Sequence, residues 1–420
     1  MRKIKQLFFV WITLFCSANI CAQDTMQHII ANRTNSVENQ QKPYVILISA
    51  DGFRYDLAQR YDAKNLLRLS GNGVQAASMK PSYPSLTFPN HYTLITGLYP
   101  AHHGLVGNSF YDRKRNQSYK MNDTKAVRDG SWYGGEPLWV LAEKNKMVSA
   151  SFFWVGSETP IDSTFPTYYF NYSEAFKIDR RLQILQEWLQ LPDTTRPHLI
   201  TFYFPEVDHE EHLYGVDSKQ AKDAVAYVDN AIGKMDSMCS NLNLPINFIF
   251  VSDHGMANTD TSKTIKRPLA IDPAKFIIPS GDAMIQLYAK DKKDIAPTYK
   301  ALKKEANGRY LVYLKNKMPK RFHYNSKNDK YDRIGDIILI AYPPLAFNFG
   351  GGKSIGRHGF DNDLPDMQAT FYAWGPAFKQ KYKIGNFENV HVYPLVAQVL
   401  GLQYDFKIDG KLKVLQSILK

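Results

Sequence analysis

The sequence predicts an α/β protein with a mostly parallel central sheet, helices on both faces and an inserted α+β lobe. Apolar, β-favouring runs at 44–49 and 246–251 are typical of strands buried on both sides. Strand and helix patterns alternate between these runs, as they do in parallel sheets covered by helices. An aspartate follows each run, at Asp51 and Asp253, and open α/β sheets place their sites at that edge.

The remaining elements follow in chain order. Leucine spacing predicts a helix over 62–72, and Pro89 suits the first turn of a helix, so Thr87 is expected just before a helix begins. A hydroxyl there faces free backbone N–H groups, which favour a phosphate. The alternating part is predicted as strand 147–154, helix 173–191, strand 198–204, helix 218–239 and strand 246–251. The chain closes with a strand at 369–374 and a helix at 391–400.

A segment rich in Lys and Tyr, from about 258 to 350, interrupts this alternation. It contains a predicted helix at 294–306 and predicted strands at 310–314 and 336–342. We interpret it as the inserted lobe, lying near the site. With 44% hydrophobic and 22% charged residues in 420, the chain has ordinary globular composition, which one large domain with an insertion fits as well as two domains do. We expect a single catalytic domain at 43–420 that contains the inserted lobe.

The first residues have the parts of a secretory signal. Basic residues precede an apolar run and then small residues, which predicts a signal peptide at 1–22 and export to the periplasm or the outside of the cell. The apolar run is too short for a convincing membrane anchor, so none is expected after cleavage. Residues 23–42 are polar and are expected to form a loose leader.

Cysteine content and charge limit the function classes. Cys16 and Cys21 leave with the signal, so the mature chain keeps only Cys239 and no internal disulfide is expected. Loss of three basic residues lowers the formal charge from +12 to +9, which could favour anionic partners. The lysines are scattered, however, so we expect dispersed surface charge, a small-molecule substrate and no stable nucleic-acid partner.

Metal-type ligands occur at several predicted strand ends or adjoining loops. They are Asp51, Asp208 with His212, Asp253 with His254, and His358. The i, i+4 spacing of Asp208 and His212 places both on one face of a helical turn. Six ligands of mixed oxygen and nitrogen character suit two zinc-like ions that each keep a position open for substrate. The sequence therefore predicts a dinuclear metal site.

The motifs resemble the nucleotide pyrophosphatase/phosphodiesterase family of the alkaline-phosphatase superfamily, as a catalytic domain only. The resemblance rests on Asp51-Gly-Phe-Arg, the stretch from Thr87 to Gly97, Asp208 with His212, Asp253-His-Gly-Met, and His358-Gly-Phe-Asp-Asn. It implies an alkaline-phosphatase-like fold and two Zn²⁺ ions. One would be bound by Asp51, Thr87, Asp253 and His254, and the other by Asp208, His212 and His358.

The resemblance also implies roles in catalysis. Thr87 would attack phosphorus, giving a covalent phospho-threonine ester and then a nucleoside 5′-monophosphate. The commoner role of a threonine in this place is a helix N-cap. Asn108 would hold a phosphate oxygen, Phe88 and Tyr169 would enclose the base, and Met121 and Tyr203 would line the pocket. For Phe88 and Tyr203, packing in the hydrophobic core remains an alternative to contact with the substrate.

One segment departs from the family pattern. Where the family has Glu-Pro-Asp-x-x-Gly-His, this chain reads Glu-Val-Asp-His-Glu-Glu-His over 206–212, so Glu211 replaces a glycine. We expect His209 and Glu211 to be solvated.

The leading functional hypothesis is a phosphodiesterase or nucleotide pyrophosphatase. The alternatives are a zinc phosphomonoesterase and a choline-lipid phosphodiesterase of the same superfamily. The loop 155–159 lacks the Lys or Arg that a monoesterase needs for the extra phosphate charge, which favours the diesterase. A choline site would need an aromatic and acidic cage, and the tyrosines of 168–172 leave that open. A non-catalytic scaffold is disfavoured because all seven metal-site positions are intact.

Overall fold

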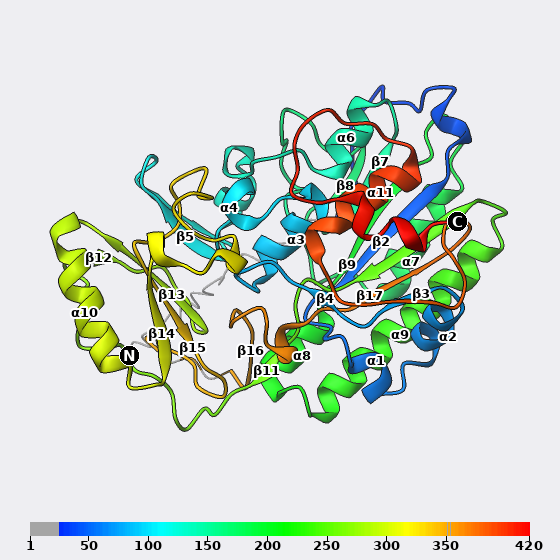
Figure 1. The fold of residues 1–420 in the computed structure, drawn as a ribbon. Coiled ribbons are helices and arrows are strands. Elements are labelled where there is room, and N and C mark those ends of the chain that lie inside the picture. The colour runs from blue at the N-terminus through cyan, green and yellow to red at the C-terminus, as the bar shows by residue number, and fades with distance from the viewer. Residues whose placement is uncertain (1–24, 351, 353) are drawn as a thin grey trace, which may run out of the picture.

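A computed structural model describes residues 25–350, 352 and 354–420 (Figure 1). The predicted signal peptide lies outside these residues. The predicted α/β class is confirmed: a nine-stranded sheet forms the centre, in the order β1-β8-β7-β9-β2-β10-β17-β3-β18. Its strands are β1 (His28–Ile29), β8 (Tyr168–Phe170), β7 (Ser149–Phe152), β9 (Leu199–Phe204), β2 (Tyr44–Ala50), β10 (Ile246–Val251), β17 (Phe371–Trp374), β3 (Val74–Ala76) and β18 (Tyr382–Ile384).

The middle of the sheet is parallel. β8, β7, β9, β2 and β10 run in one direction, whereas β17 pairs antiparallel with β10 and β1 pairs antiparallel with β8. Because β2 and β10 lie side by side in register, with Ser49 opposite Val251, the residues that follow them emerge at the same edge. This edge holds the candidate site.

Helices cover both faces of the sheet, as β2 itself shows. Val45 and Leu47 pack into a core with α3 (Thr87–Thr96), α6 (Leu138–Lys144) and α11 (Val392–Leu400). Ile46 and Ile48 pack on the other face with α2 (Lys64–Asn72), α7 (Ile178–Leu189) and α9 (Lys219–Ser240). Burial on both faces explains why the run at 44–49 is continuously apolar rather than alternating.

Most element boundaries match the sequence prediction within a few residues, and the largest difference is at α7. The helix predicted over 173–191 begins only at Ile178. Before it, the chain folds so that the Phe176 ring packs edge-on against Phe152 and Phe170, with ring centroids 5.5 and 5.1 Å apart. Tertiary packing of this aromatic cluster overrides the helical pattern of the preceding residues.

The segment between β11 (Ala257–Asn258) and β16 (Gly356–Arg357) forms the lobe at the left of Figure 1. Its four strands are β12 (Phe276–Ile277), β13 (Met284–Ala289), β14 (Tyr310–Leu314) and β15 (Ile337–Ala341), in the order β12-β13-β15-β14. All neighbours are antiparallel, and α10 (Ile295–Ala306) covers this sheet. The lobe has its own hydrophobic core, and β11 pairs with β16 at its base.

The predicted loose leader is wrong for the described residues 25–42, because these pack on the domain. β1 adds a strand to the central sheet, and Asn35 is buried, with its Nδ2 donating to the carbonyl oxygens of Asp193 and Arg196. The Asn35 side chain thus supplies a hydrogen-bond donor to backbone carbonyls of a distant segment. The polar composition of this leader does not reveal that role.

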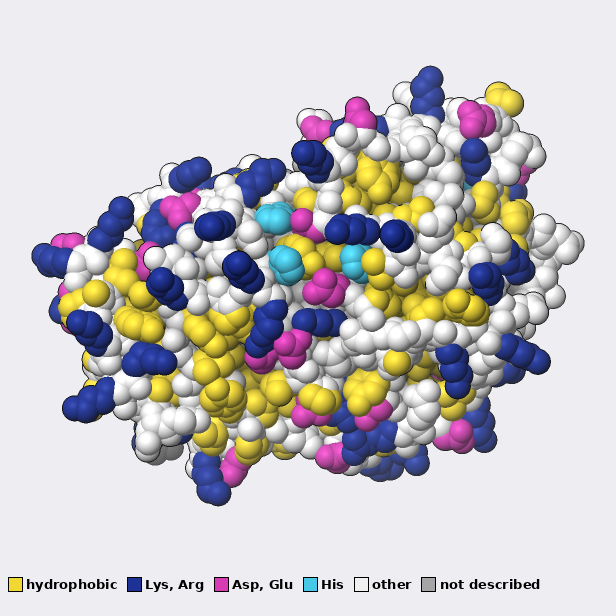
Figure 2. All heavy atoms as spheres, in the orientation of Figure 1, with side chains coloured by type: hydrophobic (Ala, Val, Ile, Leu, Met, Phe, Trp, Pro, Cys, Tyr) yellow, Lys and Arg dark blue, Asp and Glu magenta, His cyan; other side chains and the backbone are white. Residues whose placement is uncertain are grey.

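Lys and Arg side chains are spread over the face shown in Figure 2 rather than gathered into one patch. Within the described residues, none of the helices has both the length and the apolar character needed to cross a bilayer.

Candidate metal centre and active site

Two neighbouring strands deliver the first pair of ligands. Asp51 follows β2, Asp253 follows β10, and both side chains are buried. The N–H of Gly52 donates to Asp253 Oδ1 at 3.2 Å. Gly52 has φ +69°, and a Cβ there would lie 3.0 Å from the Cα of Asp208. A glycine is therefore needed for the helix that bears Asp208 to approach the end of β2.

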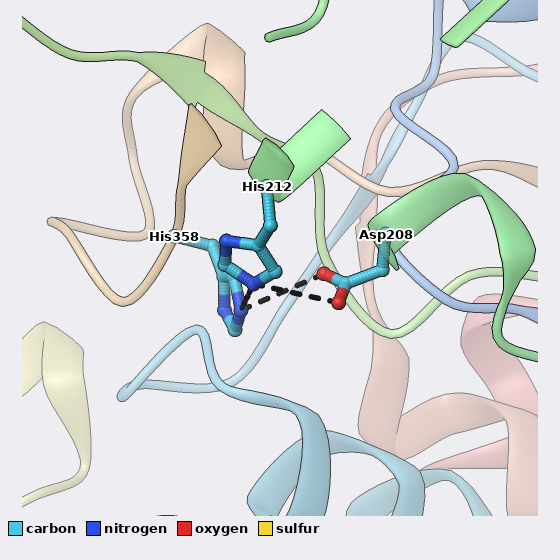
Figure 3. A group of neighbouring side chains, drawn as sticks. All are labelled: Asp208, His212 and His358. Carbon is cyan, nitrogen blue, oxygen red and sulfur yellow. Dashed lines mark hydrogen bonds and ion pairs between the residues drawn. The ribbon is translucent and has the colours of Figure 1, made fainter. Parts of the chain in front are cut away.

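That helix is α8 (Glu206–Tyr214), and it places Asp208 and His212 one turn apart. His358 follows β16 and points toward the same spot (Figure 3). His212 Nε2 lies 3.4 Å from Asp208 Oδ2 and 3.1 Å from His358 Nε2, and His358 Nε2 lies 3.6 Å from Asp208 Oδ1. The ring of His358 also stacks on that of His254, with centroids 3.7 Å apart.

The three histidines share one orientation. In each, Nδ1 donates to a backbone carbonyl: His212 to Gly356 at 2.8 Å, His358 to Ser85 at 3.0 Å, and His254 to Gly255 at 3.0 Å. A carbonyl oxygen can only accept, so Nδ1 is protonated and Nε2 faces the centre. Backbone carbonyls fix metal-binding imidazoles in this way.

The donor set fits two cations. Ligand atoms of Asp208, His212 and His358 lie within 4.8 Å of one another, and so do those of Asp51, Asp208 and His254. One buried oxygen on each of Asp51, Asp208 and Asp253 has no hydrogen-bond partner in the described part of the chain. Buried oxygens of this kind normally have a partner, and divalent ions would supply it.

The electrostatics agree with this assignment. Burial, together with the carboxylates of Asp253 and Asp208, raises the pKa of Asp51 well above its ordinary value. Burial, His254 and His212 lower the pKa of His358, which favours the neutral imidazole that binds metals. Burial opposes the charged form of His254, but Asp253, at 2.9 Å from Nε2, raises its pKa overall. A cation between them would replace this proton.

Thr87 is the first residue of α3, half-buried, and its Oγ1 lies 3.3 Å from His254 Nε2. The structure therefore brings the predicted nucleophile to the predicted first ion site. The N-terminus of α3 offers fewer free donors than expected, because Phe88 N–H donates to Asn108 Oδ1 at 2.9 Å and Pro89 has no N–H. This bond occupies Asn108 Oδ1, so the amide Nδ2 is the group left to donate elsewhere.

A cavity of about 500 Å³ opens beside this centre. Its lining includes the polar side chains of Asp51, Thr87 and Asp208. It also includes three side chains that were predicted to contact the substrate, those of Phe88, Met121 and Tyr203. Asn108 lies on an adjoining cavity that also contains His212 and His358. Tyr203 has a second contact that the sequence did not reveal, because its hydroxyl donates to Asp51 Oδ2 at 2.6 Å.

The expectation that Tyr169 encloses the base is wrong. Tyr169 lies on β8, stacked between His28 and Phe165 at 4.8 and 5.0 Å. Tyr172, which follows the strand, lines the cavity and is exposed. Side chains alternate along β8, with Tyr168 and Phe170 in the core, and only beyond the strand end does the chain turn toward the cavity.

In segment 206–212, which departs from the family pattern, both His209 and Glu211 were expected to be solvated. This is correct for His209, which is exposed, and wrong for Glu211, which is fully buried. Val207 and Glu211 are four residues apart and share the inner face of α8. Neither carboxylate oxygen of Glu211 has a hydrogen-bond partner among the described residues. Burial and Asp208 raise the pKa of Glu211 well above its ordinary value.

Sequence reasoning missed His91, which lies one helical turn after Thr87 and is fully buried. Its ring forms a third close group with Asp51 and Asp253. The i, i+4 spacing from the nucleophile was the available signal.

Known proteins resemble this chain in sequence. The family profile of Type I phosphodiesterase / nucleotide pyrophosphatase matches residues 45–361. Human ectonucleotide pyrophosphatase/phosphodiesterase family member 1 is 35% identical over 380 residues, which cover 86% of this chain and 40% of the human protein. Venom phosphodiesterase CdcPDE of Crotalus durissus collilineatus is 32% identical, with 87% of this chain and 45% of the venom protein covered. The chain thus spans less than half the length of these relatives.

Solved structures extend the comparison to the fold. Murine ectonucleotide pyrophosphatase/phosphodiesterase 5, an inactive threonine-to-alanine variant in complex with AMP, superposes with a TM-score of 0.84 at 27% identity, covering 90% of this chain and all of the murine chain. The human protein of the same name gives a TM-score of 0.83, also at 27% identity, covering 90% of this chain and 99% of the human chain. From the matched residues 45–361 and the identity to these relatives, the chain belongs to the Type I phosphodiesterase / nucleotide pyrophosphatase family.

Proposed function

We propose that this protein hydrolyses nucleotide phosphodiesters or pyrophosphates to nucleoside 5′-monophosphates, with Thr87 as the nucleophile. The observation that carries the proposal is the position of Thr87. Its hydroxyl lies 3.3 Å from His254 Nε2 in the carboxylate-histidine centre, and Thr87 also lines the cavity of about 500 Å³, a size suited to a small ligand. The AMP complex of the murine relative, an inactive threonine-to-alanine variant, supports both the nucleotide and the threonine.

We further propose that the ions are two Zn²⁺. Asp51, Thr87, Asp253 and His254 would hold one, and Asp208, His212 and His358 the other. Bound there, zinc would act as a Lewis acid that lowers the pKa of a hydroxyl and balances the negative charge of the phosphate.

The residues of the chain then have distinct tasks. Thr87 Oγ1 forms a bond to phosphorus while the bond from phosphorus to the leaving oxygen breaks, giving a phospho-threonine ester. Asn108 is oriented by the N–H of Phe88, so its Nδ2 can donate to a non-bridging phosphate oxygen. Phe88 and Tyr172 offer aromatic surfaces to the base. Water then cleaves the ester and regenerates the Thr87 hydroxyl.

The cavity supports a diester over a monoester. Among the described residues that line the cavity, Arg128 is the one basic side chain, and Glu158 balances its charge at 3.1 Å. A phosphomonoesterase would need cations for the additional phosphate charge. We also propose export to the periplasm or the outside of the cell, which rests on the sequence of residues 1–22 alone.

The test compares Thr87→Ala with Thr124→Ala, a change of another hydroxyl on the same cavity. Thr87→Ala should abolish turnover of a p-nitrophenyl nucleotide diester and keep two zinc ions per chain, whereas Thr124→Ala should keep turnover. In the unmodified protein, kcat/KM for the diester should far exceed that for p-nitrophenyl phosphate. Turnover by Thr87→Ala would refute the nucleophile, and a kcat/KM ratio below one would identify a monoesterase.

A further inference from the structure

A fourth histidine, which is buried, lies against the candidate centre and is outside the proposed ligand set. His91 is on α3, four residues after Thr87, and is fully buried. Its Nδ1 lies 3.4 Å from Asp253 Oδ2, the oxygen that also lies 2.9 Å from His254 Nε2. The ring could therefore be a metal ligand or a residue that positions its neighbours, and its hydrogen bonds decide between these roles.

The hydrogen bonds of His91 fix its protonation. Nδ1 lies 3.0 Å from the carbonyl oxygen of Thr87, which can only accept, so Nδ1 bears the hydrogen. In this tautomer the other ring nitrogen, Nε2, has a lone pair. Ser49 Oγ, at 2.8 Å from Nε2, donates its hydroxyl hydrogen to that lone pair.

This arrangement separates His91 from the three histidines of the centre. Those rings also donate through Nδ1, but their Nε2 atoms face the carboxylates. In His91, one nitrogen holds a proton and the other accepts from Ser49, so neither is free to bind a cation. The ring is thus suited to holding its neighbours in place.

The surroundings prevent the ring from turning. The ring of Trp154 packs edge-on against it at 5.4 Å and the ring of Tyr203 at 5.1 Å. Trp154 Nε1 also donates to the backbone carbonyl of His91 at 3.0 Å. His91 thereby joins β2, through Ser49, to the first turn of α3 and to the loop after β10.

We propose that His91 is a positioning residue that sets the Thr87 nucleophile relative to the metal ligand Asp253. The inference rests on the proposed role of Thr87. Loss of the Nδ1–H donor removes a hydrogen bond from the Thr87 carbonyl oxygen, so the backbone that bears the nucleophile can shift. A displacement of about 1 Å at a nucleophile can lower the rate by about 100-fold. The cavity that receives the substrate lacks His91 among its lining residues, so KM should change little.

Two substitutions separate the two ring nitrogens. In His91→Asn, the amide Nδ2 takes the place of Nδ1 and keeps the donor to Thr87. In His91→Gln, the longer side chain places its amide near Nε2 and loses that donor. We expect kcat to fall by about 100-fold in His91→Gln and by less than about 10-fold in His91→Asn, with KM and two bound zinc ions retained in both.

A matched control is His198→Asn. His198 is also fully buried, and its Nδ1 donates to the Pro43 carbonyl at 3.2 Å. It lies beside the start of β2, whereas the candidate metal centre lies beyond the end of that strand. It should leave kcat unchanged. A wild-type kcat in His91→Gln would overturn the proposal, because His91 would then not position the nucleophile. Loss of one zinc ion from His91→Gln would also overturn it, because His91 would then be a metal ligand.

A second measurement is independent of turnover and of the folding of variants. ¹⁵N–¹H spectra of the histidine rings in the unmodified protein should show His91 as the Nδ1–H tautomer, both without and with zinc. An Nε2–H form, or a nitrogen shift on zinc addition typical of a coordinated ring, would refute the proposal. If the unmodified protein failed to cleave any nucleotide diester, the proposed function would fail, while this spectrum would still test the tautomer.

Discussion

Tyr203→Phe tests whether the hydroxyl of Tyr203 supports the metal centre rather than only lining a pocket. The hydroxyl donates to Asp51 Oδ2 at 2.6 Å, and the other oxygen of Asp51 has no hydrogen-bond partner within the described chain. The substitution removes one oxygen atom and keeps the ring, which packs against His91. Any effect therefore reports on the bond to Asp51.

The magnitude follows from the type of bond. A hydrogen bond to a charged group contributes about 1.5–3 kcal/mol, which corresponds to about 10- to 150-fold in an equilibrium constant. Loss of a residue that orients a metal ligand typically lowers metal affinity by about 10- to 100-fold. We therefore expect zinc affinity to fall by about 10- to 100-fold in Tyr203→Phe.

The assay is zinc competition against a chelator of known affinity, with Tyr172→Phe as control. The Tyr172 ring lies 6.3 Å from that of Tyr203 and lines the same cavity, but its hydroxyl lies 3.2 Å from Glu174 instead of a metal ligand. Tyr172→Phe should leave zinc affinity unchanged. Equal zinc affinity in Tyr203→Phe and the unmodified protein would show that the bond to Asp51 does not hold the ligand in place.

Three further predictions concern other residues. Asn108→Ala should lower kcat by about 100-fold through loss of a donor to phosphate, and an unchanged rate would show that Asn108 does not contact it. Burial lowers the pKa of His103 to about 3 from 6.5, so the unfolded chain binds the proton first and stability falls as pH drops from about 6.5 to 3. His103→Gln should flatten that acid limb, measured by urea unfolding, by up to about 1.4 kcal/mol per pH unit, and equal slopes would contradict this. Glu211→Gln should stabilise the zinc-free protein by about 1–3 kcal/mol, whereas Glu210→Gln, half-buried, should not; a loss of stability would show that Glu211 has a partner.

The placement of the candidate metal ligands could be predicted because it follows from regular structure. Parallel strands end at one edge, so Asp51 and Asp253 meet once β2 and β10 are identified. Residues 208 and 212 share a helix face by their spacing alone. These relations depend on local periodicity, which a sequence displays directly.

The residues that sequence reasoning misplaced depend on tertiary packing. Tyr169 and Tyr172 belong to one aromatic run, and only the end of β8 at Phe170 decides which ring reaches the cavity. Glu211 has the polarity of a surface residue, and the packing of Val207 against the core carries it inside. The leader is polar, yet Asn35 satisfies buried backbone groups far along the chain. In each case strand pairing or packing in three dimensions decides the position of the side chain, and local periodicity does not show it.

The histidines show how the same side chain acquires different tasks in this fold. His91, His212, His254 and His358 all donate Nδ1–H to a backbone carbonyl, so the backbone sets which nitrogen remains. What lies opposite Nε2 then determines the role. Carboxylates face it in three rings and make a place for a cation, whereas the Ser49 hydroxyl faces it in His91 and removes that ring from the ligand set. Ser49 lies on β2, two residues before Asp51, so one strand leads to a candidate metal ligand and also supplies the hydroxyl that faces His91.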